Sequence, residues 1–346
     1  MSVFYRLVRF IFSNYNQLYF RRFRVVGKEN IPNEGAILFS PNHQNALLDP
    51  LLVGTTAGKS IHSLTRSDVF GGPLQWFLDA MQTLPIYRIR DGYDQLKKNQ
   101  AVFEQCYALL GDKKHMMMFS EGRHHGEYYL LRLSKGSSRL VLEAQLKHPH
   151  HPIYLQPVGL NYGNHRHAQN DCVVVYGKPI DVRAYVDRYQ SNPAKGVNDL
   201  RYQLQAAMEA CLWLPKNNAL YGTKKPFINR KNTALSFEKL KAALEKDQPS
   251  LEKPTKKTTL HHFMIGLLSF PNLPLHLAVL LLIGQFNDNV FHGSMNYLGS
   301  LVFCLLWWAL GIVAFSQAID VYWGLYFFLI SLSSLYIRQI IINRSL

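Results

Sequence analysis

The sequence predicts an α/β domain followed by a membrane region, and three observations carry this prediction. Short apolar segments bounded by glycine and proline alternate with amphipathic helical segments between residues 23 and 215, as in α/β domains. Apolar residues concentrate after residue 260. Lys and Arg number 38 against 23 Asp and Glu, a net charge of +15, which indicates an anionic partner such as nucleic acid, a phospholipid surface or a phosphorylated substrate. The apolar C-terminal region favours the phospholipid surface.

Residues 1–22 predict a helix that lies in the membrane interface. Apolar and aromatic residues from Phe4 to Phe12 are interleaved with Arg6 and Arg9, so the arginines can reach lipid headgroups while the apolar face enters the bilayer. A helix packed on its own domain is the alternative. The segment lacks the unbroken apolar stretch and the small-residue cleavage site of a secretory signal.

Residues 23–215 predict the α/β domain itself. Turn signals at Gly27 and from Pro32 to Gly35 bracket two strands, and an amphipathic segment closed by Gly111 predicts a helix. The same periodicities continue to residue 215. The predicted strands are 23–26, 36–40, 60–68, 81–89, 114–120, 153–163 and 172–180, and the predicted helices are 92–111, 134–147 and 197–214.

Residues 216–260 predict a polar connector that is surrounded by solvent, and residues 261–346 predict two or three membrane spans. The connector is rich in lysine and contains one helical piece, "ALSFEKLKAALEK". Three apolar segments follow: 263–284, interrupted by Pro271 and Pro274, then 297–315 and 319–337. The second and third are long enough to cross a bilayer. Because lysines precede this region and arginines end it, both ends prefer the cytoplasm. Two cytoplasmic ends require an even number of crossings. We therefore favour two spans, with the first segment re-entrant or interfacial, and keep three spans as the alternative.

The cysteines and histidines predict neither a disulfide framework nor a metal site. The four cysteines are scattered without a C-x-x-C pair, which indicates a reducing compartment. No histidine lies in an H-E-x-x-H motif. We interpret the paired and clustered histidines as surface residues, namely His124 and His125, His148 to His151, and His165 and His167.

The stretch "SPNHQNALLDP", residues 40–50, contains a candidate catalytic pair. A histidine acts as a general base when a carboxylate binds one ring nitrogen and leaves the other free to take a proton. His43 and Asp49 are six positions apart, which puts them on different sides of a regular helix. We therefore expect His43 to precede a helix that begins near Asn45, with Asp49 leaning back toward it. In the alternative interpretation, His43 only ends a strand and Asp49 only caps a helix.

Three further stretches supply candidate substrate-binding residues. In "LPIYRIRDG", Arg88 offers a forked cation to a phosphate. In "MMMFSEGRHHG", a strand delivers Glu121 and Gly122 into a loop, where glycine lets backbone amides approach an anion or a hydroxyl. In "LRLSKGSSRL", Lys135 stands where a helix begins, which favours a bound phosphate.

Taken in order, these blocks resemble the glycerolipid acyltransferases, which esterify glycerol 3-phosphate or lysophosphatidic acid. "SPNHQNALLDP" resembles the histidine-aspartate block of that family, "LPIYRIRDG" its arginine block, "MFSEGRHHG" its F-P-E-G block and "LQPVGLNYG" its final proline-containing strand. The resemblance covers about residues 25 to 215. It implies a mixed, mostly parallel sheet flanked by helices, as in glycerol-3-phosphate acyltransferases, here with an N-terminal interfacial helix and C-terminal transmembrane helices.

The resemblance also implies a role for each motif residue. His43 would deprotonate the acceptor hydroxyl, and Asp49 would orient His43. The residues that would place the acceptor's phosphate and glycerol are Arg88, Glu121, Gly122, Arg123 and Lys135, with Pro157 in the pocket wall. Two features depart from the commonest pattern: five residues separate the histidine from the aspartate in place of four, as in a subgroup from fungi and some bacteria, and Ser120 stands where proline is usual.

These expectations amount to a membrane-bound acyltransferase. The resemblance implies transfer of a fatty acyl group from acyl-CoA or acyl-ACP, a co-substrate and not a bound cofactor, to lysophosphatidic acid or glycerol 3-phosphate. The sequence has no G-x-S-x-G elbow, so we expect direct transfer without an acyl-serine. Membrane phospholipids and the donor thioester, carried by coenzyme A or by acyl carrier protein, are the expected partners. Nucleic acid is not an expected partner, and the catalytic domain should face the cytoplasm. The alternatives are a non-catalytic, membrane-anchored basic protein that binds anionic lipid or nucleic acid, and an acyltransferase for another lysolipid.

Overall fold

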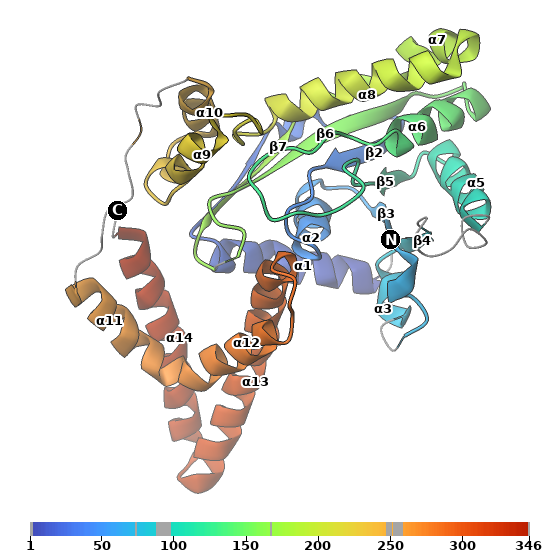
Figure 1. Cartoon of the computed structure of the whole chain (residues 1–346). Coiled ribbons are helices and arrows are strands. Elements are labelled where there is room, and N and C mark those ends of the chain that lie inside the picture. The colour runs from blue at the N-terminus through green and yellow to red at the C-terminus, as the bar shows by residue number, and fades with distance from the viewer. Residues whose placement is uncertain are drawn as a thin grey trace.

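The structure is a computed structural model, and it describes residues 3–72, 75–87, 98–166, 168–246, 251 and 259–344. Figure 1 shows an α/β domain with a bundle of C-terminal helices below it. Arg88 and the start of the predicted helix 92–111 lie outside the described residues.

One mixed sheet forms the centre of the α/β domain. Its strand order is β1-β7-β6-β2-β5-β3-β4, with the short β8 beside β6. Neighbouring strands are parallel except that β6 runs antiparallel to both β7 and β8. The predicted mostly parallel sheet is therefore confirmed. The strands are β1 (Arg22–Val26), β2 (Ala36–Pro41), β3 (Ile61–Arg66), β4 (Thr83–Ile86), β5 (His115–Met117), β6 (Ile153–Tyr162), β7 (Asp171–Tyr176) and β8 (Ile180–Asp181).

Helices cover both faces of this sheet (Figure 1). On one face, α5 (Lys98–Gly111), α6 (Gly136–Lys147) and α8 (Pro193–Ala210) contribute to a core with strand residues such as Leu38. On the other face, α1 (Val3–Tyr19) and α2 (Leu48–Thr56) pack on Ile37 and Phe39. Every residue of β2 is buried, because a central strand of such a sheet is covered on both sides.

The structure shortens several predicted elements and adds others. The predicted strand 114–120 is reduced to β5, because the chain leaves the sheet after Met117 to form a loop. The predicted strand 81–89 is preceded by a short helix that the sequence analysis missed, α3 (Gln75–Ala80). The predicted strand 172–180 is divided into β7 and β8. A further short helix, α7 (Val186–Ser191), precedes α8.

Part of the predicted solvated connector is instead packed against the domain. It contains α9 (Tyr221–Lys224) and α10 (Phe237–Glu245). Phe237 and Leu240 of α10 are buried against Trp213 and Ile228 in a third apolar cluster. In "SFEKLKAALEK", apolar residues recur at helical spacing, which is the pattern of a helix with one buried face. The expectation of a solvated connector is therefore wrong for residues 221–245.

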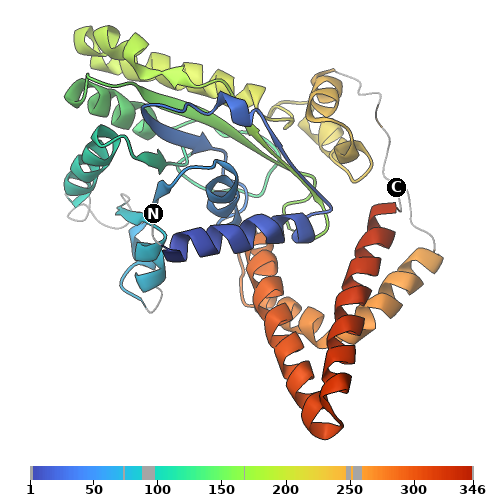
Figure 2. The same ribbon diagram turned by 180° about the vertical axis from the view of Figure 1, so that it is seen from behind.

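Within the part of the chain that the structure describes, three C-terminal helical segments are long and apolar enough to cross a membrane, namely His262–Gly284, Val290–Ala318 and Val321–Arg338. The last two are α13 (Val290–Ala318) and α14 (Val321–Arg344), which form a hairpin (Figure 2). Their outer surfaces expose Leu305, Leu310 and Leu329 by more than half, as expected for helices surrounded by lipid. Together these helices make the protein membrane-associated.

The first of the three segments is bent at its prolines. It consists of α11 (Thr259–Ser269), a short turn η7 (Phe270–Asn272) and α12 (Leu273–Gly284). In both Figure 1 and Figure 2, α11 and α12 rise from the turn as two arms of a V. Asn272, fully buried at this turn, donates its side-chain amide to the carbonyl of Ser331 on α14 at 3.1 Å. All three segments qualify as spans by length and composition, so the re-entrant arrangement of the first segment stays a prediction.

Candidate active site

The site lies at the edge of the sheet where β2 and β5 end. His43 follows β2 by two residues, and Glu121 follows β5 by four. β2 and β5 are parallel neighbours, so their carboxyl ends bring these loops together. Ligand sites of open α/β sheets occur at this edge.

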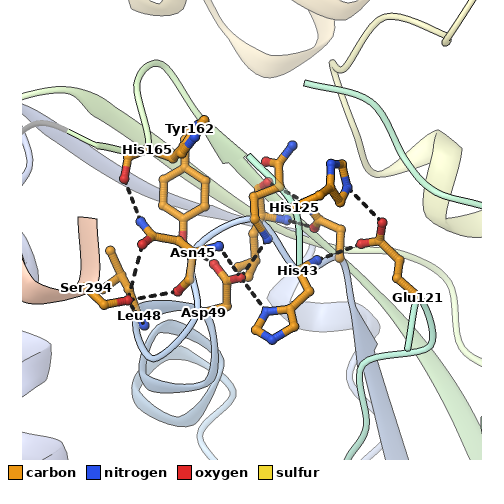
Figure 3. Close-up of polar contacts among 12 residues, drawn as sticks. His43, Asn45, Leu48, Asp49, Glu121, His125, Tyr162, His165 and Ser294 are labelled. Carbon is orange, nitrogen blue, oxygen red and sulfur yellow. Dashed lines mark hydrogen bonds and ion pairs between the residues drawn. The ribbon is translucent and has the colours of Figure 1, made fainter. Parts of the chain in front are cut away.

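His43 and Asp49 form the predicted pair (Figure 3). Nδ1 of His43 lies 2.8 Å from Oδ2 of Asp49. The helix α2 begins at Leu48 and not near Asn45, so the intervening residues form a turn that brings Asp49 back to the histidine. Asp49 does not cap its helix, because Oδ2 accepts from groups that precede the helix and Oδ1 accepts from Tyr162. The expected hydrogen bond is confirmed, and the expected helix start is wrong by three residues.

The Asp49 carboxylate is buried and fully hydrogen-bonded. Besides His43, Oδ2 accepts the backbone N–H groups of Gln44 and Asn45, each at 2.8 Å. Oδ1 accepts the hydroxyl of Tyr162 at 2.6 Å. The Asp49 side chain is 0% exposed. Four donors around a buried carboxylate stabilise its charge, so Asp49 presents a fixed anion to one side of the His43 ring.

The other side of the His43 ring faces the site. The ring stacks on Phe119 with a centroid distance of 3.8 Å. Within the part of the chain that the structure describes, Nε2 of His43 has no hydrogen-bond partner. The His43 side chain is 15% exposed. With Nδ1 held by the carboxylate, Nε2 is the nitrogen that can exchange a proton with a bound molecule.

Glu121 holds the loops of the site together. Its Oε1 accepts the backbone N–H of His43 at 2.7 Å. Its Oε2 accepts hydrogen bonds from Nε2 of His125 at 3.0 Å and from the backbone N–H of Leu131 at 2.9 Å. The Glu121 side chain is 0% exposed. Glu121 therefore fixes the backbone at His43, and its expected contact with the glycerol stays a prediction.

Hydroxyl groups connect β2 to the start of α6. Oγ of Ser40 lies 2.6 Å from Oγ of Ser120, which donates to Oγ of Ser137 at 2.7 Å. The carbonyl of Ser120 also accepts the N–H of Ser134 at 2.7 Å. Ser120, which stands in place of the usual proline, thus joins the loop to the helix. Both ends of the loop that contains Glu121 are held at the first turn of α6.

Cationic residues flank this junction. Arg123 is exposed beside Gly122, whose backbone has a φ of 73°. Lys135 is exposed and stands immediately before α6. Oγ of Ser134 would lie 3.9 Å from a Cβ placed on Gly122, so the two ends of the loop are close. The helix start, with its free N–H groups, can receive an anion here.

Two further predicted residues need separate comment. Arg88 lies outside the described residues, so its place in the site stays a prediction. Pro157 pairs with Ser40 in the β2 and β6 register, and its ring lies near Gly177. Its role in the pocket wall is likewise a prediction.

Three of the histidines that we interpreted as surface residues belong to the site. His125 binds Glu121, and His124 lies edge-on to His43 with a centroid distance of 5.6 Å. Burial and the charge of His43 lower the pKa of His124, although Asp288, 3.6 Å away, opposes this shift. His165 is 5% exposed. The surface interpretation is wrong for these three residues because it considered only local sequence.

The sequence analysis also missed residues that act through contacts distant in the chain. Tyr162 ends the strand of the "LQPVGLNYG" block, and only the fold aims its hydroxyl at Asp49. Asn45 donates its side-chain amide to the carbonyl of His165 at 2.7 Å, and Ser294 binds the turn around Asn45 (Figure 3). Ser294 gave no signal, since it lies just before the apolar segment 297–315 and more than 240 residues from Asn45. Among the described residues, no group of three or more His, Cys, Asp or Glu is arranged to hold a metal ion.

Comparisons with known proteins find similarity to acyltransferases. The model of the family described as Acyltransferase matches residues 22–161, a segment that contains His43, Asp49 and Glu121. The crystal structure of a 1-acyl-sn-glycerophosphate (LPA) acyltransferase, PlsC, from Thermotoga maritima aligns with a TM-score of 0.40 and 16% identity, covering 57% of this chain and 79% of that chain. No curated protein matches the sequence. The family match confirms the resemblance seen in the sequence blocks: residues 22–161 of the chain match the acyltransferase family.

Proposed function

We propose that this protein transfers a fatty acyl group from a coenzyme A or acyl carrier protein thioester to a hydroxyl of glycerol 3-phosphate or lysophosphatidic acid. The observation that carries the proposal is the 2.8 Å contact between Nδ1 of His43 and a buried carboxylate, which leaves Nε2 directed at the site. This arrangement suits a general base for a hydroxyl.

The proposed reaction needs one base and no covalent enzyme intermediate. Nε2 of His43 takes the proton of the acceptor hydroxyl while its oxygen attacks the thioester carbonyl carbon. The tetrahedral intermediate collapses with cleavage of the carbon–sulfur bond, and the imidazolium returns its proton to the leaving thiolate. Asp49 stabilises the imidazolium between the two proton transfers. The products are an ester and a free thiol.

The cationic start of α6 supports a phosphorylated acceptor. Arg123 and Lys135 are both exposed in the segment between β5 and α6 that contains Glu121, and a phosphate accepts charge-assisted hydrogen bonds from such groups. We propose that they bind the acceptor's phosphate together with Arg88. The net charge of +15 would raise the local concentration of anionic acceptors.

Exposed apolar surface supports a site placed at the membrane interface. α1 exposes Val3, Leu7, Phe10, Ile11 and Leu18 along one face. Figure 1 and Figure 2 show α1 running across the side of the domain from which α13 descends. We propose that α1 lies in the interface on the cytoplasmic side while α13 and α14 span the bilayer. A lipid product would then leave the site without crossing water.

The experiment that tests the proposal is an acyl-transfer assay with two acceptors. Purified full-length protein in detergent receives glycerol 3-phosphate or lysophosphatidic acid with radiolabelled palmitoyl-CoA or palmitoyl-acyl carrier protein. We expect one acceptor to form labelled ester, and His43→Ala to abolish it. His150→Ala, which changes an exposed histidine, is the matched control.

The acceptors also separate the alternatives. Labelled product only with a lysolipid that has no phosphate monoester would reject the proposed acceptor class and favour the other-lysolipid alternative. No product with any acceptor, or full activity in His43→Ala, would reject the proposed reaction. A purely lipid-binding protein would bind anionic vesicles equally well in both forms and make no ester.

A further inference from the structure

The start of the membrane helix α13 is inserted behind the candidate active site. Tyr297 of α13 is fully buried in the same apolar cluster as Leu48 and Leu52 of α2. Its hydroxyl donates to Oδ1 of Asn16 on α1 at 2.6 Å. The first two turns of α13 are therefore part of the core of the α/β domain, and only the later turns enter the membrane region.

One residue of this insertion, Ser294, binds the turn that joins His43 to Asp49. Its Oγ accepts the backbone N–H of Leu48 at 3.0 Å. The same hydroxyl lies 3.1 Å from the carbonyl of Asn45 and can donate to it. Ser294 is 0% exposed. Figure 3 shows it reaching from the α13 ribbon to this turn.

The turn bound by Ser294 determines where the Asp49 carboxylate lies. The N–H of Asn45 donates to Oδ2 of Asp49, and the carbonyl of Asn45 accepts the N–H groups of Leu48 and Asp49. Asn45 and Leu48 therefore close a ring of hydrogen bonds around Asp49. Ser294 bridges the two ends of that ring, because it binds one end as acceptor and the other as donor.

The neighbouring Gly293 brings α13 close enough for this contact. A Cβ on Gly293 would lie 2.0 Å from the carbonyl oxygen of His165 and 2.5 Å from Nδ2 of Asn45. Only glycine permits this approach. The same Nδ2 atom donates to the carbonyl of His165 at 2.7 Å, so α13, the Asn45 turn and the loop after β6 meet at one point.

We propose that Ser294 and Gly293 of the membrane helix position the His43 and Asp49 pair, so that the C-terminal membrane region is a working part of the catalytic site as well as an anchor. Ser294 and Gly293 are positioning residues, because neither touches a reacting atom. The proposal rests on the proposed acyl transfer. It adds that the rate of acyl transfer depends on the position of α13 relative to the His43 and Asp49 pair.

The first test compares Ser294→Ala with Ser316→Ala. Ser316 lies on the same helix, and its hydroxyl has no hydrogen-bond partner among the described residues. We expect Ser294→Ala to lower kcat about 10- to 100-fold with little change in the acceptor KM, because a misplaced base affects the transition state more than binding. Ser316→Ala should match the wild type. Equal kcat in all three proteins would overturn the proposal.

The second test asks whether the loss acts through Asp49. In an Asp49→Asn background the carboxylate that Ser294 positions is already absent, so adding Ser294→Ala should change kcat less than threefold. Residues that act as a unit show this non-additivity. If Ser294→Ala lowers kcat by the same factor in both backgrounds, it acts on the protein generally, and the proposal fails.

The third test uses glycines. Gly293→Ala should lower kcat at least as much as Ser294→Ala, whereas Gly284→Ala, at a position with no atom within 4 Å of an added Cβ, should not. Thermal unfolding in detergent and protease protection in vesicles verify that each variant is folded and inserted. A kcat loss that merely follows the folded fraction would contradict the proposal. Wild-type protein without acyl transfer would instead reject the proposed function.

Discussion

The hydroxyl of Tyr162 lies 2.6 Å from Oδ1 of Asp49, so the last strand of the matched segment holds the carboxylate that orients His43. We expect Tyr162→Phe to lower kcat about tenfold, which corresponds to about 1.4 kcal/mol in the barrier. The free energy of unfolding should fall by about 1–3 kcal/mol, because Oδ1 loses its partner while buried. Steady-state kinetics and thermal unfolding measure the two effects.

The matched control is Tyr176→Phe. Tyr176 is also buried, but its hydroxyl pairs with Thr56 at 2.7 Å. This variant should lose stability and keep kcat. Equal kcat losses in both tyrosine variants would show that Tyr162 acts only through packing.

The charge of Asp49 can be tested without changing the size of the side chain. Asp49→Asn should lower kcat about 10²- to 10⁴-fold, because a neutral amide does not stabilise the imidazolium. In addition, the NH₂ group of the asparagine would face hydrogen-bond donors that the carboxylate accepts in the wild type. Asp187→Asn, at an exposed position, should have no effect. Activity of Asp49→Asn within threefold of the wild type would contradict the general-base role of His43.

The start of α6 predicts an effect on acceptor binding. Lys135→Ala should raise the KM for the phosphorylated acceptor about 10- to 100-fold, because a hydrogen bond to a charged group contributes about 1.5–3 kcal/mol. The kcat should change little, and Lys135→Arg should recover most of the loss. Lys178→Ala removes an equally exposed lysine and should leave KM unchanged. An unaltered KM in Lys135→Ala would remove this lysine from the phosphate site.

Burial of His165 predicts a pH dependence of stability. Burial, with a smaller effect of Arg166, lowers the pKa of His165 from 6.5 to about 4. Between these values the unfolded chain binds a proton that the folded chain does not. Stability therefore falls as the pH falls from 6.5 to 4, by up to about 1.4 kcal/mol per pH unit from this histidine. Above pH 6.5 His165 is neutral in both states, so it no longer changes the free energy of unfolding with pH.

His165→Phe should flatten this dependence. The ring packs on Tyr128, and neither ring nitrogen has a hydrogen-bond partner among the described residues, so phenylalanine keeps the packing. The unfolding midpoint between pH 7 and 5 should drop less in His165→Phe than in the wild type. His150→Phe, at an exposed site, should keep the wild-type slope. Identical slopes in His165→Phe and the wild type would contradict the lowered pKa.

Local patterns in the sequence were sufficient for the main strands and the longer helices α6 and α8 of the α/β domain and for the His43 and Asp49 pair, but not for the short helices α3 and α7. The strand predicted at 36–40 is β2, extended by one residue to Pro41, since a run of apolar residues between turn signals fixes a buried strand locally. The pair was found because its two residues are only six positions apart. The packing of α10 and the burial of His165 were missed, because both depend on segments that meet only after folding.

The sequence by itself determined that this chain would form an α/β domain with a basic surface, a histidine beside an aspartate and apolar helices at its C-terminal end. These features follow from residue type and short-range spacing, which the chain carries before it folds. Only the tertiary structure decided that Tyr162, Glu121 and Ser294 would surround the pair. Hydrogen bonds are short and directional, so a partner 246 positions from Leu48 is selected by how the helices and sheet pack.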